Sequence, residues 1–323
     1  MKIFGKEFKL FNYTLDGKGV KKEPEGPKNL KNFFKYFGSK FSRLMTVNLY
    51  YILGNFPILF AMLAMSGNLD RDSYAPAYKL FAPVYGIMKH TQSPATSALF
   101  GLFGTQAEIG FQTVFTKIAW GLSLLVLFTF GFVNIGTTYI IRNMVKGEPI
   151  FMWDDFWYAI KRNWKQGLIM GIIDVVVSLL VCYDIVFFYY NTGVSGMMNF
   201  MFYAAILLAA LWFWMRFYIY LVMITFDLSI FKILKNALIF SLVGFKRNFM
   251  ATLGIAVMIG LTYTIMLLYL PLGIIIPFVL VFADCTFMAC YAAWPKIKEI
   301  MIDPYYTDPD PEPEEEPIFH DLG

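Results

Sequence analysis

Four ionisable side chains stand inside long apolar runs of this chain: Asp174, Asp184, Arg216 and Asp284. A charged group at the centre of a bilayer costs about 2.5 to 3.5 kcal/mol on insertion scales, so such residues usually face a bundle interior and pair with one another. Along helices that rise about 1.5 Å per residue, Asp174, Arg216 and Asp284 come to a similar depth in one leaflet. We therefore predict a buried cluster in which Arg216 lies between two carboxylates. Asp184 comes nearer the opposite interface, where contact with water accounts for it.

Two interpretations of this intramembrane cluster stay open. In the first, the charges serve function, as a substrate anchor or a proton-coupled gate. In the second they serve structure, because one buried ion pair fixes the register of neighbouring helices. Replacement of Arg216 by Met tests the cluster through folding, abundance and partner binding.

Enzyme motifs are absent from the sequence. It holds no Gly-rich phosphate loop, no pair of histidines at metal-ligand spacing and no Gly-x-Ser-x-Gly elbow, and its two histidines are His90 and His320. Intramembrane aspartyl chemistry would need Asp174 and Asp284 to share a proton, whereas Arg216 between them would keep both ionised. We therefore predict no catalytic residue, no metal site and no cofactor, in a protein that is not an enzyme.

The composition is that of a membrane protein. Hydrophobic residues make up 58% of the 323, charged residues 15% and aromatic residues 19%, a balance that argues against a water-soluble domain. Lys and Arg gather in alternate gaps between six apolar runs, at residues 2–43, 142–165, 232–247 and 296–298. Because basic segments stay cytoplasmic, this alternation predicts that both termini face the cytosol. Anionic lipid headgroups suffice as partner for these bases, so nucleic acid is not predicted.

The elements that must position the charged residues are six membrane-spanning helices. Each apolar run has the roughly 20 residues that a hydrocarbon core of about 30 Å requires. The fold class is therefore all-α: a polytopic membrane bundle of about six transmembrane helices with interfacial amphipathic helices. The predicted spans are 44–65, 115–141, 167–190, 197–226, 251–270 and 273–293. Only Pro271 and Leu272 separate the last two, which predicts a tight external hairpin.

We divide the chain into three parts. Residues 1–43, with eleven Lys or Arg against four acids, form a basic cytoplasmic segment that includes an interfacial helix. Residues 44–300 form the transmembrane domain, with one long external loop at 68–112. Within that loop, residues 94–101 are small and apolar, and they either dip into the membrane or lie at the surface. Residues 301–323 are rich in Pro and acids, which predicts a disordered cytoplasmic tail.

Two of the basic gaps have the pattern of helices that lie in the interface plane. In residues 150–165 the aromatic side chains occupy one broad helical face and the charges the other, and residues 227–249 are likewise amphipathic and basic. Exposed aromatics beside Lys and Arg also suit an interface with a partner protein. The residues that we assign to this cytoplasmic interface are Trp153, Asp155, Phe156, Trp157, Lys161, Arg162, Trp164, Asp227, Lys235, Lys246 and Arg247.

A weak repeat links these gaps. Lys161-Arg162-Asn163-Trp164 precedes the third span and Lys246-Arg247-Asn248-Phe249 the fifth, while Lys40-Phe41-Ser42-Arg43 holds the equivalent place before the first. Each unit would be an interfacial helix followed by a membrane hairpin. The alternative is that any cytoplasmic flank must be basic and aromatic, so that topology alone produces the likeness.

Several blocks resemble the YesL-like family of bacterial integral membrane proteins, which share a domain of unknown function, number 624. The blocks are Gly147-Glu148-Pro149-Ile150-Phe151-Met152-Trp153-Asp154-Asp155-Phe156-Trp157, the trailing Lys161 to Gln166, Thr225-Phe226-Asp227-Leu228-Ser229 and Lys235-Asn236-Ala237. The resemblance implies a multi-pass protein of the kind encoded near carbohydrate-uptake ABC systems and polysaccharide-degrading enzymes. It supplies no catalytic or ligand residues. The external segment 68–112 and the acidic tail depart from the family pattern.

Two hypotheses about function follow. The first is a non-enzymatic accessory or scaffold subunit that docks on the permease subunits of an ABC sugar transporter through the cytoplasmic interface. The second is a small permease for a sugar or other small solute, with Asp174, Arg216 and Asp284 along its path. A water-filled cavity that reaches Arg216 would favour transport, and a dry core would favour the scaffold.

Overall fold

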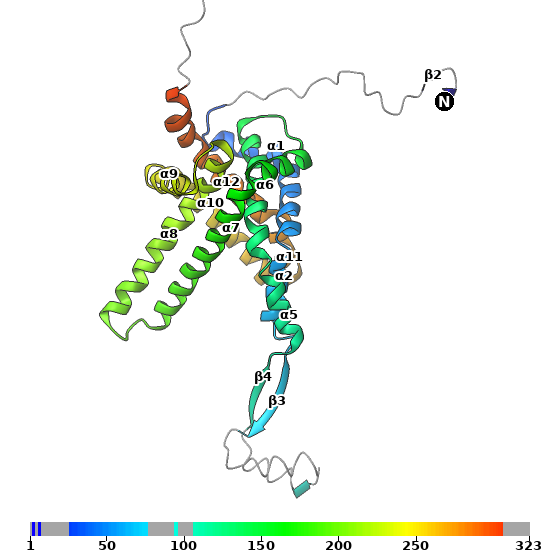
Figure 1. Ribbon diagram of the computed structural model, residues 1–323, viewed down its shortest axis with the longest axis vertical. Helices are drawn as coiled ribbons and strands as arrows, with labels where there is room; N and C mark the ends of the chain where they lie inside the picture. The colour runs from blue at the N-terminus through cyan, green and yellow to red at the C-terminus, as the bar shows by residue number, and fades with distance from the viewer. Residues whose placement is uncertain (1, 4–5, 8–25, 77–93, 96–105, 306–323) are drawn as a thin grey trace, which may run out of the picture. The chain divides into compact units, whose positions relative to one another are not determined.

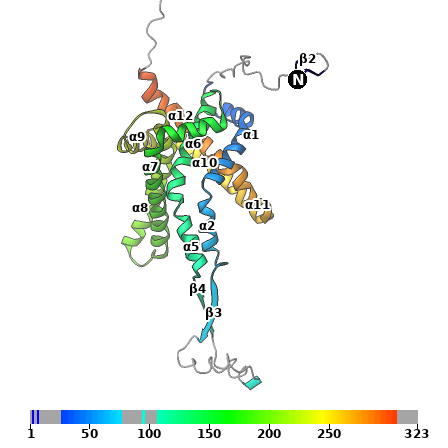
Figure 2. The same cartoon turned by 45° about the vertical axis from the view of Figure 1, so that its right-hand side comes forward.

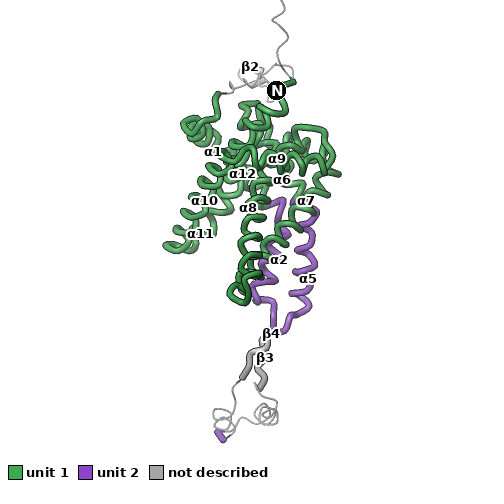
Figure 3. The backbone as a smooth tube through the Cα atoms, turned by 90° about the vertical axis from the view of Figure 1, so that its left-hand side faces the viewer, with its two compact units in different colours: residues 1–52, 131–323 green, residues 53–130 purple. Residues whose placement is uncertain are grey.

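The computed structural model describes residues 2–3, 6–7, 26–76, 94–95 and 106–305, and the structural statements below concern these residues. Most of the predicted acidic tail and of the stretch 94–101 lies outside them. The chain divides into two structural units, which Figure 3 shows in different colours. The larger unit consists of residues 1–52 and 131–323, and the smaller of residues 53–130.

The larger unit is a bundle of helices (Figure 1). Helices α7 and α8 are consecutive and lie side by side in Figures 1 and 2, α8 also packs against α9 and α12, and α10 packs against α11 and α12. The helices of this unit are α1 (Leu30–Gly54), α6 (Val126–Lys146), α7 (Met152–Tyr190), α8 (Gly196–Thr225), α9 (Ile230–Val243), α10 (Phe245–Leu268), α11 (Leu270–Ile276), the π-helix η2 (Pro277–Val281), α12 (Phe282–Ile297), the π-helix η3 (Lys298–Ile302) and the 3₁₀ helix η4 (Asp303–Tyr305). Strands β1 (Lys2–Ile3) and β2 (Lys6–Glu7) pair near the N-terminus.

Both the inward and the outward faces of these helices are apolar. Leu44 of α1, Met144 of α6 and Phe287 of α12 are fully buried in the bundle. On the outer faces, Leu179 of α7 is 64% exposed and Tyr203 of α8 is 69% exposed. Such large apolar surfaces would be unfavourable in water, but against lipid tails they need no protein partner.

The smaller unit contains a helix pair and a β-hairpin. Its elements are α2 (Pro57–Met65), β3 (Arg71–Pro76), β4 (Gln106–Phe111) and α5 (Val114–Ser123). α2 packs against α5, and the two strands pair antiparallel with Arg71 opposite Phe111 and Pro76 opposite Gln106. Thr113 caps α5, because its hydroxyl accepts from the Thr116 amide and donates to the Leu69 carbonyl. The segment 68–112, which the sequence predicted as a long external loop, therefore contains two paired strands.

The membrane-spanning elements confirm the predicted fold class, an all-α polytopic bundle. Within the described residues, five helices are long and apolar enough to cross a membrane, or six if the interrupted pair α1 and α2 counts as one span. The first span differs from the prediction of 44–65, since α1 already begins at Leu30 and ends at Gly54. Pro57 explains the interruption, because its ring lacks an amide proton and clashes with the carbonyl four residues earlier.

The predicted interfacial helix at 150–165 is joined to the third span. Helix α7 runs from Met152 to Tyr190, with non-helical backbone angles only at Asn163. The Asn163 amide donates to the Ala159 carbonyl at 3.0 Å, and a side chain that bonds the preceding turn in this way favours a bend. The amphipathic part and the span are therefore two helical segments that meet at a kink at Asn163.

Two of the three proposed repeats share a break between the amphipathic helix and the span that follows it. Before α10, the break falls at Gly244, and the Asn248 amide donates to the Ser241 carbonyl of α9 at 3.0 Å. Asn163 and Asn248 thus each bond back to the amphipathic helix that precedes a span. At the first of the three repeat positions, α1 continues without a break through Ser42. No kink therefore separates an amphipathic helix from a span there.

Glycine sets the distance between α6 and α7. An added Cβ on Gly131 would lie 2.0 Å from the Gly167 carbonyl oxygen and 2.8 Å from the Gly171 Cα. Backbones approach this closely only where both helices carry small residues, which is a common device in membrane bundles. Phe156 occupies the equivalent space beside Gly136, where an added Cβ would meet its ring at 2.3 Å.

We predict that Gly131→Ala lowers the free energy of unfolding by about 1 to 3 kcal/mol, because the methyl group has no room between the helices. Gly260→Ala on α10 is the matched control, since an added Cβ there meets nothing within 4 Å. It should be neutral or gain up to about 1 kcal/mol from helix propensity. Thermal unfolding in detergent, followed by circular dichroism, measures both. Equal melting temperatures for Gly131→Ala and the unmodified protein would contradict the close contact.

Candidate functional site

A ladder of polar side chains joins α7 to α8. Asp174 and Ser178 stand one turn apart on α7, opposite Trp212, Arg216 and Tyr220, which stand one turn apart on α8. The Arg216 Nε lies 2.9 Å from the Asp174 Oδ1. The Tyr220 hydroxyl donates to the Asp174 Oδ2 at 2.9 Å, and the Trp212 Nε1 donates to the Ser178 Oγ at 3.1 Å. We call these five residues the α7–α8 ladder.

The ladder satisfies its own carboxylate. Asp174 is fully buried, and its two oxygens accept from Arg216, Tyr220 and the Ser178 hydroxyl. The Arg216 side chain is 34% exposed, so its charge keeps some contact with the surroundings. An ionised carboxylate in an apolar bundle is tolerated when a counter-charge and hydrogen-bond donors surround it. The arrangement is therefore suited to holding two spans in register.

Asp284 does not join this pair. The sequence placed it beside Arg216 because both lie at a similar distance along their helices, but distance along a helix does not determine which way a side chain points. Asp284 is fully buried on α12, and neither of its oxygens has a hydrogen-bond partner among the described residues. The predicted cluster of one arginine between two carboxylates is thus a pair, Asp174 with Arg216, and a separate lone acid.

Asn48 of α1 hydrogen-bonds the backbone just before Asp284. The Asn48 amide donates to the Val279 carbonyl at 2.9 Å, and its oxygen accepts from the Ala283 amide at 2.9 Å. One turn further on, the Tyr51 and Thr286 hydroxyls share a hydrogen bond of 2.9 Å. Interhelical bonding by Asn48 follows the general use of amide side chains in membrane bundles.

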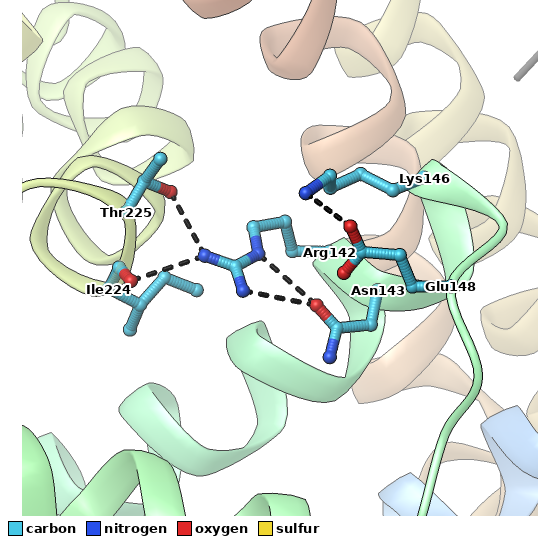
Figure 4. A network of polar contacts seen from close by, with 6 residues as sticks. All are labelled: Arg142, Asn143, Lys146, Glu148, Ile224 and Thr225. Carbon is cyan, nitrogen blue, oxygen red and sulfur yellow. Dashed lines mark hydrogen bonds and ion pairs between the residues drawn. The ribbon is translucent and has the colours of Figure 1, made fainter. Parts of the chain in front are cut away.

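A buried arginine ties the end of α8 to α6 (Figure 4). The Arg142 Nη1 donates to the Ile224 carbonyl at 3.1 Å and to the Thr225 hydroxyl at 3.3 Å, while Nε and Nη2 both donate to the Asn143 side-chain oxygen. Its guanidinium also lies 4.6 Å from the centre of the Tyr139 ring. The carbonyls at a helix C-terminus lack intrahelical partners and carry partial negative charge, so a cation there satisfies and stabilises the helix end.

Two further cations act at neighbouring helix ends. The Lys28 ammonium donates to the Val145 carbonyl near the end of α6. Lys146 forms an ion pair of 2.6 Å with Glu148 and lies 5.3 Å from the Trp294 ring of α12. Gly147 follows α6 with a positive φ of 74°, which suits the residue just past a helix end.

Sequence reasoning treated these cations as orientation signals and missed their contacts. Arg142 is the clearest case, since only 8% of it is exposed. Its position at the end of an apolar run, next to Asn143, was a visible signal. Tyr220 and Ser178 were missed as well, although each stands four residues from a charged residue already singled out, Arg216 and Asp174.

Most of the predicted cytoplasmic interface lies at the surface of the larger unit. Trp153 is 61% exposed, Trp164 is 51% exposed and Trp157 is 41% exposed. Helix α7 is linked to the segment just before α9, because the Gln166 side-chain amide donates to the Leu228 carbonyl at 3.0 Å. We call the exposed members the basic-aromatic face, which comprises Trp153, Trp157, Lys161, Arg162, Trp164, Asp227, Lys235 and Lys246.

Three residues assigned to that interface have structural contacts instead. Phe156 is 7% exposed and packs on Tyr50, with ring centres 4.9 Å apart, because one aromatic of the amphipathic helix turns into the core. Asp155 accepts from the Phe151 amide at 2.9 Å at the start of α7. Arg247 is half-buried and reaches the Lys28 carbonyl at 3.4 Å.

Apolar helices long enough to span a bilayer, with charges paired between them, define a polytopic helical membrane protein. Residues 113–185 match the model of a family described as protein of unknown function, DUF624, which confirms the resemblance to the YesL-like family. The matched range runs from the start of α5 through most of α7, and it includes the block at 147–166. No curated protein and no solved structure matches this chain.

The ladder predicts strong coupling between Asp174 and Arg216. Arg216→Met leaves a buried carboxylate without its counter-charge and should cost about 2 kcal/mol of unfolding free energy, less than a wholly buried pair because Arg216 is partly exposed. Adding Asp174→Asn should recover at least about 1 kcal/mol of that loss, which thermal unfolding of both single variants and the double variant measures. Strictly additive effects would show that the two side chains do not interact.

Arg142 predicts a difference between two basic residues. Arg142→Lys keeps the charge but cannot reach both helices with a planar fork, and it should destabilise the protein by about 1 to 2 kcal/mol. Arg162→Lys is the control, because Arg162 is exposed on α7 and a substitution there should stay within about 0.5 kcal/mol. Thermal unfolding again decides, and equal melting of the two variants would remove Arg142 as a structural tie.

Proposed function

We propose that this protein is a non-enzymatic accessory or scaffold subunit that docks on permease subunits of a carbohydrate-uptake ABC transporter. In this proposal the protein lies in the bacterial plasma membrane with both termini in the cytosol. The basic-aromatic face would then lie beside anionic headgroups. The carbohydrate context comes from the resemblance to the YesL-like family. The observation that carries a docking role is the basic-aromatic face.

The composition of that face favours a protein partner. Trp and Arg are the residues that most often anchor protein interfaces, and this face presents three exposed tryptophans beside Arg162 and several lysines. Lipid headgroups attract the same bases, so the bilayer would hold the face at the membrane surface, where a permease presents its cytoplasmic loops. Asp227 adds an acid to an otherwise basic surface.

The polar groups inside the bundle support a scaffold more than a conduit. Asp174 is saturated by donors from its own chain, and Arg142 is occupied by the end of α8. A substrate would have to displace these internal bonds before it could bind. Groups that are fully used to hold helices together make a rigid platform.

A second candidate function, a small permease for a sugar or another small solute, is favoured by Asp284 alone. This acid is buried without a hydrogen-bond partner among the described residues, as a residue on a solute path can be. Purified protein reconstituted into vesicles should then accumulate a labelled sugar. Vesicles that take up no more sugar than protein-free vesicles would remove this candidate.

The docking proposal predicts that tryptophan truncation releases the partner. Trp153→Ala combined with Trp164→Ala should reduce co-purified permease subunits about tenfold, which corresponds to about 1.4 kcal/mol of binding free energy. Purification from native membranes at native expression level, with quantitative mass spectrometry of ABC permease subunits, measures the change. Tyr203→Ala is the control, because Tyr203 is at least as exposed as the two tryptophans, at 69% against 61% and 51%, but lies on α8 outside the face. Absence of permease subunits from the unmodified preparation would refute the proposal.

A further inference from the structure

Asp284 is a buried carboxyl group that receives no hydrogen bond from the part of the chain that the structure describes. It is 0% exposed, and both side-chain oxygens lack a hydrogen-bond partner among the described residues. Asp174 provides a comparison in the same bundle, since it is equally buried but accepts from three side chains. A carboxylate left ionised without donors in an apolar interior is strongly unfavourable. Something other than the described residues must therefore balance a negative charge on Asp284.

The basic and hydroxyl groups of the surrounding elements are engaged elsewhere or lie at the surface. On α8, Arg216 and Tyr220 bond Asp174, and Tyr218 donates to Asn248. On α1, Tyr51 bonds Thr286, Lys31, Lys35 and Arg43 are exposed, and buried Lys40 has another interaction. On α9 and α10, Lys232, Lys235 and Lys246 are exposed, Arg247 bonds the Lys28 carbonyl, and Tyr263 is 60% exposed. On η3, Glu299 pairs with Lys296 of α12, and Lys298 has another interaction. Further titratable groups of α1 and α12 are Tyr36, Tyr50, Cys285, Cys290 and Tyr291.

The backbone beside Asp284 departs from a regular helix. The π-helix η2 ends at Val281, three residues before this acid, and single π-turns inside membrane helices are frequent at functional sites. Asn48 takes up the Val279 carbonyl and the Ala283 amide. The Asn48 side-chain NH₂ donates to the Val279 and Leu44 carbonyls. Asn48 therefore stabilises the π-turn but does not donate to the Asp284 carboxyl group.

We propose that Asp284 is a monovalent-cation site within the membrane domain, where the carboxyl group takes a proton or a single alkali metal ion in place of the missing donor. One carboxylate carries one negative charge, which a monovalent cation neutralises. Among the described residues, no three His, Cys, Asp or Glu side chains gather as metal ligands, and a divalent ion would need more acidic oxygens than one residue offers. The proposal is independent of docking on a transporter.

The test is labelling of the unmodified protein with N,N′-dicyclohexylcarbodiimide, an apolar reagent that reacts with carboxyl groups carrying a proton. Peptide mapping by mass spectrometry locates the adduct. We expect an adduct on Asp284 in protein embedded in lipid vesicles, and none on Asp174, which is the internal control with the same burial and a full set of donors. Asp284→Asn should abolish the adduct, but the result on the unmodified chain does not depend on the folding of that variant.

Two series identify the cation. If the occupant is a proton, labelling in sodium-free buffer should fall at least tenfold as the pH rises, and added sodium chloride should not change it. If the occupant is an alkali ion, sodium or potassium chloride at constant pH should protect Asp284 at least tenfold, while choline chloride should not. Labelling of Asp284 after denaturation in detergent but at no pH in vesicles would overturn the proposal, as would equal labelling of Asp174. Co-purification of a permease plays no part in these readouts, so the two proposals fail separately.

Discussion

Inside a bilayer, every backbone and side-chain polar group must find its partner within the protein, because lipid tails offer none. That constraint accounts for the bonds that hold the larger unit together. Asp174 draws donors from two helices, Asn48 bonds the irregular backbone before α12, and Arg142 closes the end of α8. Apolar contacts fill the space between helices, but lipid is as apolar as leucine and does not favour one packing over another. The hydrogen bonds, the ion pair and the close helix crossing at Gly131 therefore determine how these helices pack.

The basic residues serve two purposes in this chain. As a population they form the alternating pattern that predicts which segments face the cytosol. Individually, Arg142 and Lys28 donate to carbonyls near helix ends, where the backbone has unsatisfied acceptors and partial negative charge. A Lys or Arg beside the end of a span can therefore both influence membrane orientation and stabilise the helix end. The cations that make no such contact, including Lys161 and Arg162, remain at the surface and give the basic-aromatic face its charge.

The same constraint separates structural from functional charges. Asp174 and Arg216 satisfy one another, which makes them part of the framework of the bundle. Asp284 breaks the rule within the described residues, since its oxygens have no donor. Proteins keep such a costly group inside a membrane mainly where it binds something. The surface that we propose for a partner protein and the site that we propose for a cation are thus carried by different residues.

The sequence by itself determined the class of protein, the approximate positions of the apolar helices and the family resemblance, because hydropathy and length are properties of single segments. It also identified Asp174, Arg216 and Asp284 as the rare charges inside apolar runs. Only the tertiary structure decided that Asp174 pairs with Arg216 while Asp284 stands alone, that Phe156 turns into the core, and that Arg142 is a buried tie. Depth along a helix follows from the number of residues, but the direction of a side chain depends on how each helix is rotated against its neighbours. That rotation is set by contacts between residues far apart in the sequence, such as Asn48 with Ala283.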